Sequence, residues 1–164
     1  MKQIIGSKAR SLFPISHCSD LAMFGALSRD SIRFLFEHGR ILSCPKGEVI
    51  LKKGELSDRF YIILQGRLGY YRYDDAELIH IRDFKSGEQM GFVGMIGLHA
   101  RQGDAVVEQD CYLLEMTSAL FHEVCDNFAS DFVIFMINMA REMSREISDL
   151  DAICARLSSR ALHA

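Results

Sequence analysis

Residues 54–66 read Gly-Glu-Leu-Ser-Asp-Arg-Phe-Tyr-Ile-Ile-Leu-Gln-Gly, and this stretch decides how the chain folds. The polar turn residues Ser57 and Asp58 give way at once to a β-favouring run at 60–64, which ends at Gly66. Turns favour small polar residues and glycine, whereas strands favour aromatic and β-branched side chains. The stretch therefore predicts a short buried strand between two tight turns.

Similar short runs continue on both sides of this strand. The expected strands are 41–44, 48–51, 60–64, 67–73, 78–84, 105–107 and 111–116. Turn residues separate them, and no helical segment intervenes. This spacing favours an antiparallel sandwich or barrel over parallel βαβ units.

Helical periodicity flanks the strands at both ends. Before them, Ser28 is placed to cap a helix and Gly39 to end it. After them, Leu120 and Val124 predict a short helix that is interrupted around residues 126–127.

A long helix is expected to follow over 131–157, with Ser130 as its cap. At about 1.5 Å per residue it is roughly 40 Å long, which exceeds what so small a barrel can cover. Its apolar positions alternate in steps of four and three, which is a heptad pattern and predicts a parallel two-stranded homodimer. A helix packed only on its own barrel is the alternative. The predicted dimer contacts are Met136, Ala140, Met143, Ile147, Leu150, Cys154 and Leu157.

A second motif begins at Gly87 and continues to an arginine. Gly91, Gly94 and Gly97 stand at a spacing of three, and Arg101 follows shortly after. Glycines let backbone N–H groups approach an anion closely, and arginine binds phosphate oxygens with a planar fork. Ordinary turn glycines and a surface arginine are the alternative interpretation.

These segments resemble the cyclic-nucleotide-binding domain, the jelly-roll sensor of bacterial transcription regulators, kinase regulatory subunits and gated channels. The resemblance covers roughly residues 24–157. It implies an α+β fold, an antiparallel β jelly-roll barrel with flanking helices and a long C-terminal dimer helix. The expected organisation is an N-terminal arm at 1–23, the jelly roll with its cassette-like loop at 24–128, and a dimerisation helix with tail at 129–164.

In that family a glycine followed by a glutamate opens the phosphate cassette. The glutamate binds the ribose 2′-hydroxyl, and a later arginine binds the cyclic phosphate. Gly91 and Arg101 match this pattern, but Phe92 stands where the glutamate belongs. The ligand-binding residues that the resemblance implies are Gly91, Phe92, Val93, Gly94, Arg101, Gln102 and Gly103.

The departures from the family pattern have physical consequences. Phe92 cannot accept a hydrogen bond from ribose, which removes a contact of roughly 1.5–3 kcal/mol, or about one to two powers of ten in affinity. Its ring is expected to fill the ribose space or to stack on a base, and Asp104 to pair with Arg101 and hold an empty pocket shut. Glu146 and Ile147 stand where the family places polar adenine contacts.

Composition excludes several other functions. A net charge of −3 and a pI near 6.1 predict no direct nucleic acid binding, and no apolar run approaches a membrane span. Five scattered cysteines favour a reducing cytoplasm. The six histidines lack HxH or HxxxH spacing, and no hydrolase or Walker motif occurs, so neither a metal site nor catalytic residues are expected.

Two functions are consistent with these features. The first is a non-enzymatic sensor module, without a cofactor, that binds a cyclic nucleotide or related phosphorylated small molecule and signals through its dimer helix. The alternative is a ligand-free degenerate domain that acts as a dimeric scaffold for an unknown protein partner. Because the sequence ends at Ala164, no DNA-reading element is expected after the long helix.

Overall fold

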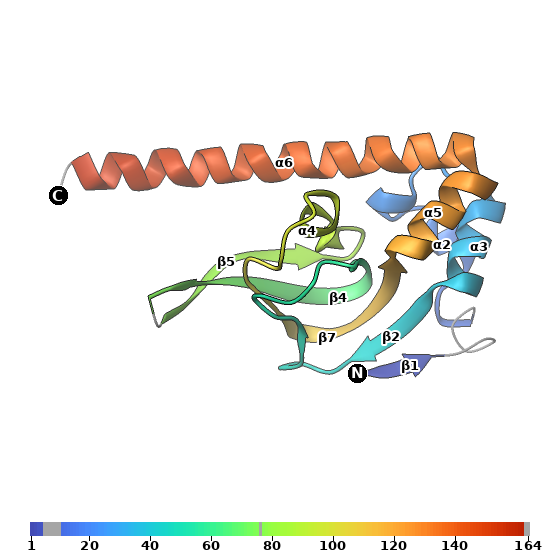
Figure 1. Ribbon diagram of the computed structural model, residues 1–164, viewed down its shortest axis with the longest axis horizontal. Helices are drawn as coiled ribbons and strands as arrows, with labels where there is room; N and C mark the ends of the chain where they lie inside the picture. The colour runs from blue at the N-terminus through green and yellow to red at the C-terminus, as the bar shows by residue number, and fades with distance from the viewer. Residues whose placement is uncertain (5–10, 76, 163–164) are drawn as a thin grey trace.

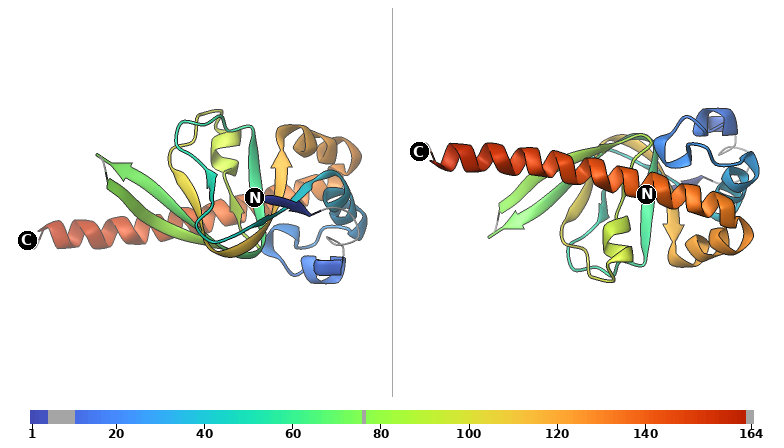
Figure 2. Two further views of the ribbon diagram at one scale, coloured as in Figure 1. Left: turned by 90° about the horizontal axis from the view of Figure 1, so that it is seen from below. Right: turned by 90° about the horizontal axis from the view of Figure 1, so that it is seen from above.

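The computed structural model describes residues 1–4, 11–75 and 77–162, in which an antiparallel sheet curls into the predicted jelly-roll barrel (Figure 1). Helices gather at one end of the barrel, and one long helix runs across it (Figures 1 and 2). The strands are β1 (Lys2–Ile4), β2 (Arg40–Cys44), β3 (Val49–Leu51), β4 (Arg59–Asp74), β5 (Glu77–Lys85), β6 (Gln89–Met90) and β7 (Asp104–Thr117). The fold class expected from the sequence is confirmed.

The sheet has the order β1-β2-β7-β4-β5, with β3 paired to β7 and β6 paired to β4. The long strands β4 and β7 are each continuous, although the sequence divided each of them into two runs. The prediction that Gly66 ends a strand was therefore wrong. Gly66 has a φ of +96°, and a Cβ there would lie 2.6 Å from the Cβ of Cys111, so glycine permits a register shift inside one strand.

The helices are α2 (Ile15–Cys18), the 3₁₀ helix η1 (Ala22–Phe24), α3 (Arg29–His38), α4 (Phe92–Ile96), α5 (Ser118–Asn127) and α6 (Ala129–Leu162). Ser28 caps α3, since its side chain accepts a hydrogen bond from the Ser31 N–H, and Gly39 follows the last turn as predicted. The break expected around residues 126–127 is the short connection between α5 and α6.

Helix α6 begins at Ala129, so Ser130 lies inside the helix and the cap predicted there was wrong. Asp131 in its first turn instead accepts hydrogen bonds from Ser28, at 3.1 Å from the backbone nitrogen and 2.5 Å from the hydroxyl. This contact fixes the start of α6 against the cap of α3. The far end of α6 projects beyond the β4–β5 hairpin in each view (Figures 1 and 2).

Two apolar clusters form the core. One contains Phe60, Phe92 and Phe121 and packs between the sheet and the helices. The other fills the barrel and includes Leu51, Phe84, Met90 and Ala105, which also line the cavity described below.

The described part of the expected N-terminal arm packs on this core. Phe13, Cys18 and Met23 are at most 4% exposed. Strand β1 pairs with β2, with Lys2 opposite Ser43. Within the described residues, no helix combines the length and the apolar character that crossing a bilayer requires.

Candidate functional site

The glycine motif forms a turn that leads from β6 into α4. Gly91 has a φ of +100°, which side-chain-bearing residues rarely adopt. A Cβ at Gly91 would lie 2.8 Å from Nη1 of Arg101, and one at Gly94 would lie 2.5 Å from Oγ of Ser57. Both glycines are therefore required for close packing against Arg101 and Ser57, whereas the predicted approach of their backbone to an anion stays a prediction. Helix α4 is a helical turn that was not predicted there.

Arg101 is buried beneath this turn, with 6% of its surface exposed. Its Nη1 donates a hydrogen bond to the Gly91 carbonyl at 2.7 Å, and its Nη2 donates one to the Arg59 carbonyl. Its Nε has no partner among the described residues. Burial lowers the pKa of Arg101, although Tyr61 and Asp58 oppose that shift, and the guanidinium stays charged. A buried cation with an unsatisfied donor is suited to bind an anion.

The structure corrects the role expected for Phe92. Its ring is fully buried, with ring centroids 5.2 Å from Phe60 and 5.9 Å from Phe121. The ring therefore belongs to the aromatic core, and the expectation that it fills the ribose space or stacks on a base was wrong. Its backbone N–H donates to Oε1 of Gln89 at 3.1 Å.

The expected pairing of Asp104 with Arg101 is also absent. Oδ1 of Asp104 accepts a hydrogen bond from the backbone N–H of Lys53 at 2.8 Å, and Oδ2 accepts one from the hydroxyl of Tyr73 at 3.0 Å. Asp104 therefore stabilises the neighbouring strands rather than closing the pocket.

A cavity of about 310 Å³ lies between the α4 turn, the barrel and α6. A volume of this size is within the usual range for small-molecule sites. Six of the seven predicted site residues line it, and Phe92 is the exception. The six are Gly91, Val93, Gly94, Arg101, Gln102 and Gly103.

The sequence motif did not identify the polar groups that β4, β5 and β6 add to this cavity. Arg72, Arg82 and Gln89 line it, together with Tyr70. The guanidinium of Arg82 stacks over the ring of Phe84 at 3.8 Å. Strands at 67–73 and 78–84 were expected, and pairing them could have placed Arg72 and Arg82 on one sheet. The register shift between Tyr70 and Tyr71 prevents their exact alignment from being derived in this way.

Helix α6 closes the cavity on its remaining side through Glu146 and Leu150. Oε1 of Glu146 lies 2.5 Å from Nη2 of Arg82 and 3.5 Å from Nε2 of Gln89. Of the two positions at which the family places adenine contacts, Glu146 therefore reaches the cavity, whereas Ile147 is 60% exposed.

Three glutamates meet where β5 and α6 approach each other. Burial raises the pKa of Glu146, with smaller contributions from Glu142 and Glu88, while Arg82 opposes the shift. Burial also raises the pKa of Glu88, against a hydrogen bond from the backbone of Lys85. Of the three, Glu146 alone lines the cavity, and its carboxylate holds its proton to a higher pH than an exposed glutamate does.

A second cavity of about 330 Å³ lies on the other side of Arg101, lined partly by Glu55 and Asp58. The described part of the chain contains no group of three or more histidine, cysteine, aspartate or glutamate side chains suited to hold a metal ion.

Comparison with known proteins agrees with this geometry. The family model described as "Cyclic nucleotide-binding domain" matches residues 41–128, which is more than half of the chain. The chain belongs to the cyclic nucleotide-binding domain family. Lysophospholipase NTE1 of Cryptococcus neoformans var. neoformans serotype D is 25% identical over 103 residues, which are 63% of this chain but only 6% of that enzyme.

Solved structures share the fold. A cyclic nucleotide-binding domain from Methylobacillus flagellatus superposes with a TM-score of 0.81 at 15% identity, covering 94% of this chain and 88% of that one. The catabolite activator protein of Thermus thermophilus gives 0.69 at 18% identity, covering 84% and 63%. The c-di-GMP responsive regulator CLP of Xanthomonas campestris gives 0.73 at 17% identity, covering 80% and 65%.

Proposed function

We propose that this chain is a non-enzymatic sensor that binds a cyclic nucleotide, or a related phosphorylated small molecule, in the cavity of about 310 Å³. The buried Arg101 carries the proposal, because it lines the cavity and has one donor without a partner among the described residues. A ligand phosphate would accept hydrogen bonds from this guanidinium. Hydrogen bonds between an ionised donor and an ionised acceptor are among the strongest in proteins, so a phosphate is a better acceptor for this guanidinium than a backbone carbonyl is.

The remaining polar lining supports recognition of the rest of a nucleotide. Because residue 92 provides no carboxylate, we propose that Glu146 and Gln89 supply the acceptors and donors for a sugar hydroxyl or a base edge. Both residues are in the cavity and contact each other. Occupancy would compete for Glu146 and so alter its ion pair with Arg82, which links ligand binding to α6.

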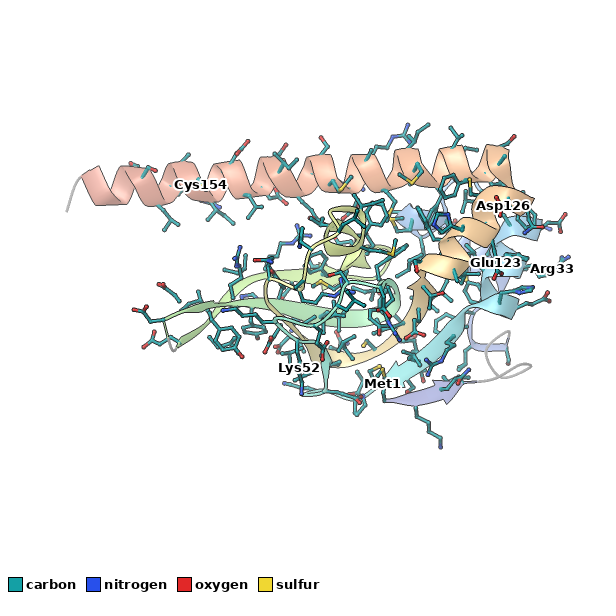
Figure 3. The ribbon with its side chains drawn as sticks, in the orientation of Figure 1. Met1, Arg33, Lys52, Glu123, Asp126 and Cys154 are labelled. Atoms are coloured by element: carbon teal, nitrogen blue, oxygen red, sulfur yellow. The ribbon has the colours of Figure 1, made fainter. Side chains whose placement is uncertain are left out.

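We further propose that α6 forms a homodimer and transmits this change. Ile147 and Leu157 are 60% and 58% exposed, and Leu150 is 40% exposed, so the far half of the predicted seam is available to a partner copy. Ala140 and Cys154 are also exposed, and Cys154 lies on the projecting part of the helix (Figure 3). Met136 and Met143, by contrast, are partly buried on the chain's own core.

Titration calorimetry tests the ligand proposal. The full chain is titrated with cyclic AMP, cyclic GMP and cyclic dinucleotides, alongside Arg101→Ala and Arg33→Ala. Arg33 is a matched control, because it is an exposed arginine that pairs only with Asp30 among the described residues. Binding by the parent and by Arg33→Ala, but not by Arg101→Ala, is expected. Silence of the parent across the panel at high micromolar concentration would remove the nucleotide from the proposal.

A ligand-free dimeric scaffold for a protein partner is the second candidate. One observation favours it: two of the Arg101 donors already bind backbone carbonyls. It predicts that the parent dimerises and remains silent in the calorimetry. The cytoplasmic location expected from the cysteines stays a prediction, as does the absence of nucleic acid binding.

A further inference from the structure

Two thiols face each other inside the barrel, away from the polar groups of the cavity. Cys44 on β2 and Cys111 on β7 are direct partners in the antiparallel ladder, and each is 1% exposed. A hydrogen bond between the two thiols is the largest influence on the pKa of each. Directly opposed residues in antiparallel strands have Cα atoms about 4.5–5.5 Å apart, which is within the roughly 4.4–6.8 Å span of disulfides. The backbone is therefore already positioned for a bond between the two sulfurs.

The surroundings give the two sulfurs different chemical roles. The hydrogen bond with Cys111 lowers the pKa of Cys44, against burial and the charge of Glu48, while the nearby N-terminal amine acts in the same direction as the hydrogen bond. That hydrogen bond, with burial, raises the pKa of Cys111. The Met1 amine pairs with Glu48. Figure 3 labels Met1 at the start of β1, the strand that pairs with β2. Cys44 is therefore the better thiolate, and Cys111 remains protonated next to it.

Cys18 shows that burial alone does not lower the pKa of a thiol in this protein. It is also fully buried, but burial raises its pKa to about 11. Its sulfur contacts the Phe13 carbonyl at 3.8 Å. Cys18 is an inert thiol in the same protein and serves as an internal control.

We propose that Cys44 and Cys111 form a redox-active pair, which oxidants of the peroxide class convert into a disulfide between β2 and β7. The Cys44 thiolate attacks one peroxide oxygen, the O–O bond breaks, and a sulfenic acid and a hydroxide form; the hydroxide takes up the proton that Cys44 released to solvent and becomes the first water. The Cys111 sulfur then attacks the Cys44 sulfur, and the S–O bond breaks as the S–S bond forms. The leaving hydroxide takes the Cys111 proton as a second water. Two thiols are oxidised and one peroxide is reduced.

This bond would have a defined effect on the domain. The covalent ring would contain residues 44–111, which include every cavity-lining residue except Glu146 and Leu150 of α6. Both cysteines also belong to the apolar cluster that forms the cavity floor. Oxidation would therefore fix β2 to β7 and stiffen the barrel side of the cavity. Helix α6 would stay outside the covalent ring.

The experiment measures which thiols pair in the folded chain. Cys125→Ser and Cys154→Ser are combined first, because these two thiols are partly or fully exposed and would link separate molecules. This full-length variant is treated with hydrogen peroxide, its remaining thiols are alkylated after unfolding, and peptides are identified by mass spectrometry. We expect the intact mass to fall by the mass of two hydrogen atoms. We also expect one pair of peptides to be joined through Cys44 and Cys111, and Cys18 to be recovered in alkylated form.

A matched variant and a second measurement keep the test decisive. Adding Cys111→Ser should abolish the loss of two hydrogens and leave Cys44 to gain oxygen atoms instead. Oxidised protein should melt several degrees higher than reduced protein, and a thiol reductant should reverse the shift. The proposal fails if the pair stays reduced while free cysteine is fully oxidised, if Cys18 is the partner, or if the bond forms only in denaturant.

Discussion

Arg82 of β5 and Glu146 of α6 face each other across the rim of the cavity, with Nη2 2.5 Å from Oε1. Their side chains are 19% and 15% exposed, so water screens the pair only partly. Both residues line the cavity, which makes this ion pair, together with the contact between Gln89 and Glu146, a polar link between the cavity and the long helix.

Removing one partner of this pair should destabilise the protein more than removing both charges. Arg82→Ala removes the cationic partner of Glu146, which lies near Glu142 and Glu88, at a cost of about 1–3 kcal/mol in the free energy of unfolding. The double variant Arg82→Ala/Glu146→Gln should recover part of that loss. Urea unfolding of parent, single and double variants measures the coupling, and strictly additive losses would show that the pair does not act as a unit.

The glutamates near α6 predict a pH dependence with a definite sign. The pKa values of Glu88 and Glu146 are raised above the ordinary 4.5 in the folded protein. Their stabilising contribution is therefore complete below pH 4.5 and is lost as the pH rises through the folded pKa values. Glu88→Gln/Glu146→Gln should flatten the decline of melting temperature above pH 4.5, relative to the parent. Identical slopes in parent and variant would contradict this assignment.

Gly91 is expected to resist substitution because of both its backbone and its neighbour. Gly91→Ala would strain a φ of +100° and place a Cβ 2.8 Å from Nη1 of Arg101, so a loss of about 1–3 kcal/mol is expected together with weaker ligand binding. Gly54→Ala is the matched control, since its φ is +85° but its Cβ would meet no atom within 4 Å. Thermal melts should give a lower melting temperature for Gly91→Ala than for Gly54→Ala. The reverse order would show that crowding against Arg101 does not destabilise the protein.

Phe92 should behave as a core residue. Phe92→Ala should cost about 3–5 kcal/mol in the free energy of unfolding, and Phe92→Leu much less. Phe92→Glu, which restores the family residue, should lower the melting temperature, since it places a charge beside Phe60 and Phe121. A Phe92→Glu variant that is as stable as the parent would show that this side chain turns toward the cavity.

The dimer is best tested on side chains that do not line the cavity. Ile147→Lys or Leu157→Lys should yield a folded monomer sedimenting near 18.6 kDa, whereas the parent should sediment at about twice that mass. Leu150→Lys should also separate the subunits, but it alters a cavity residue. Ser148→Lys on the exposed surface of α6 is the control and should remain dimeric. A parent that is monomeric at tens of micromolar would rule out the interface.

Local signals in the sequence predicted much of this arrangement. Ser28 and Gly39 bound α3 as expected, because capping depends on neighbours within four residues. The glycine spacing with Arg101 located the turn that borders the cavity. The orientation of Phe92 could not be obtained in this way, since it depends on Phe60 and Phe121, about thirty residues away on either side.

Other features required long-range pairing that composition does not encode. Strand β1 comprises only Lys2–Ile4 and is held by β2, whose partner residues begin about forty positions later. Arg82 enters the cavity because a register shift at Tyr70 and Tyr71 sets how β5 lies on β4. Asp131 was expected to follow a helix cap at Ser130, yet its carboxylate binds Ser28.

Helix α6 is held to its own domain along its first half, where Asp131 binds Ser28 and Asn138 donates hydrogen bonds to the carbonyls of Met23 and Gly25. Asn138 is the last of these anchors, and it lies about 12 Å along the helix from Glu146 and about 28 Å from Leu157, at about 1.5 Å per residue. A small rotation about Asn138 that displaces Glu146 would therefore displace Leu157 roughly 2.4 times as far. The length of the helix would amplify a movement at the cavity before any partner copy is reached.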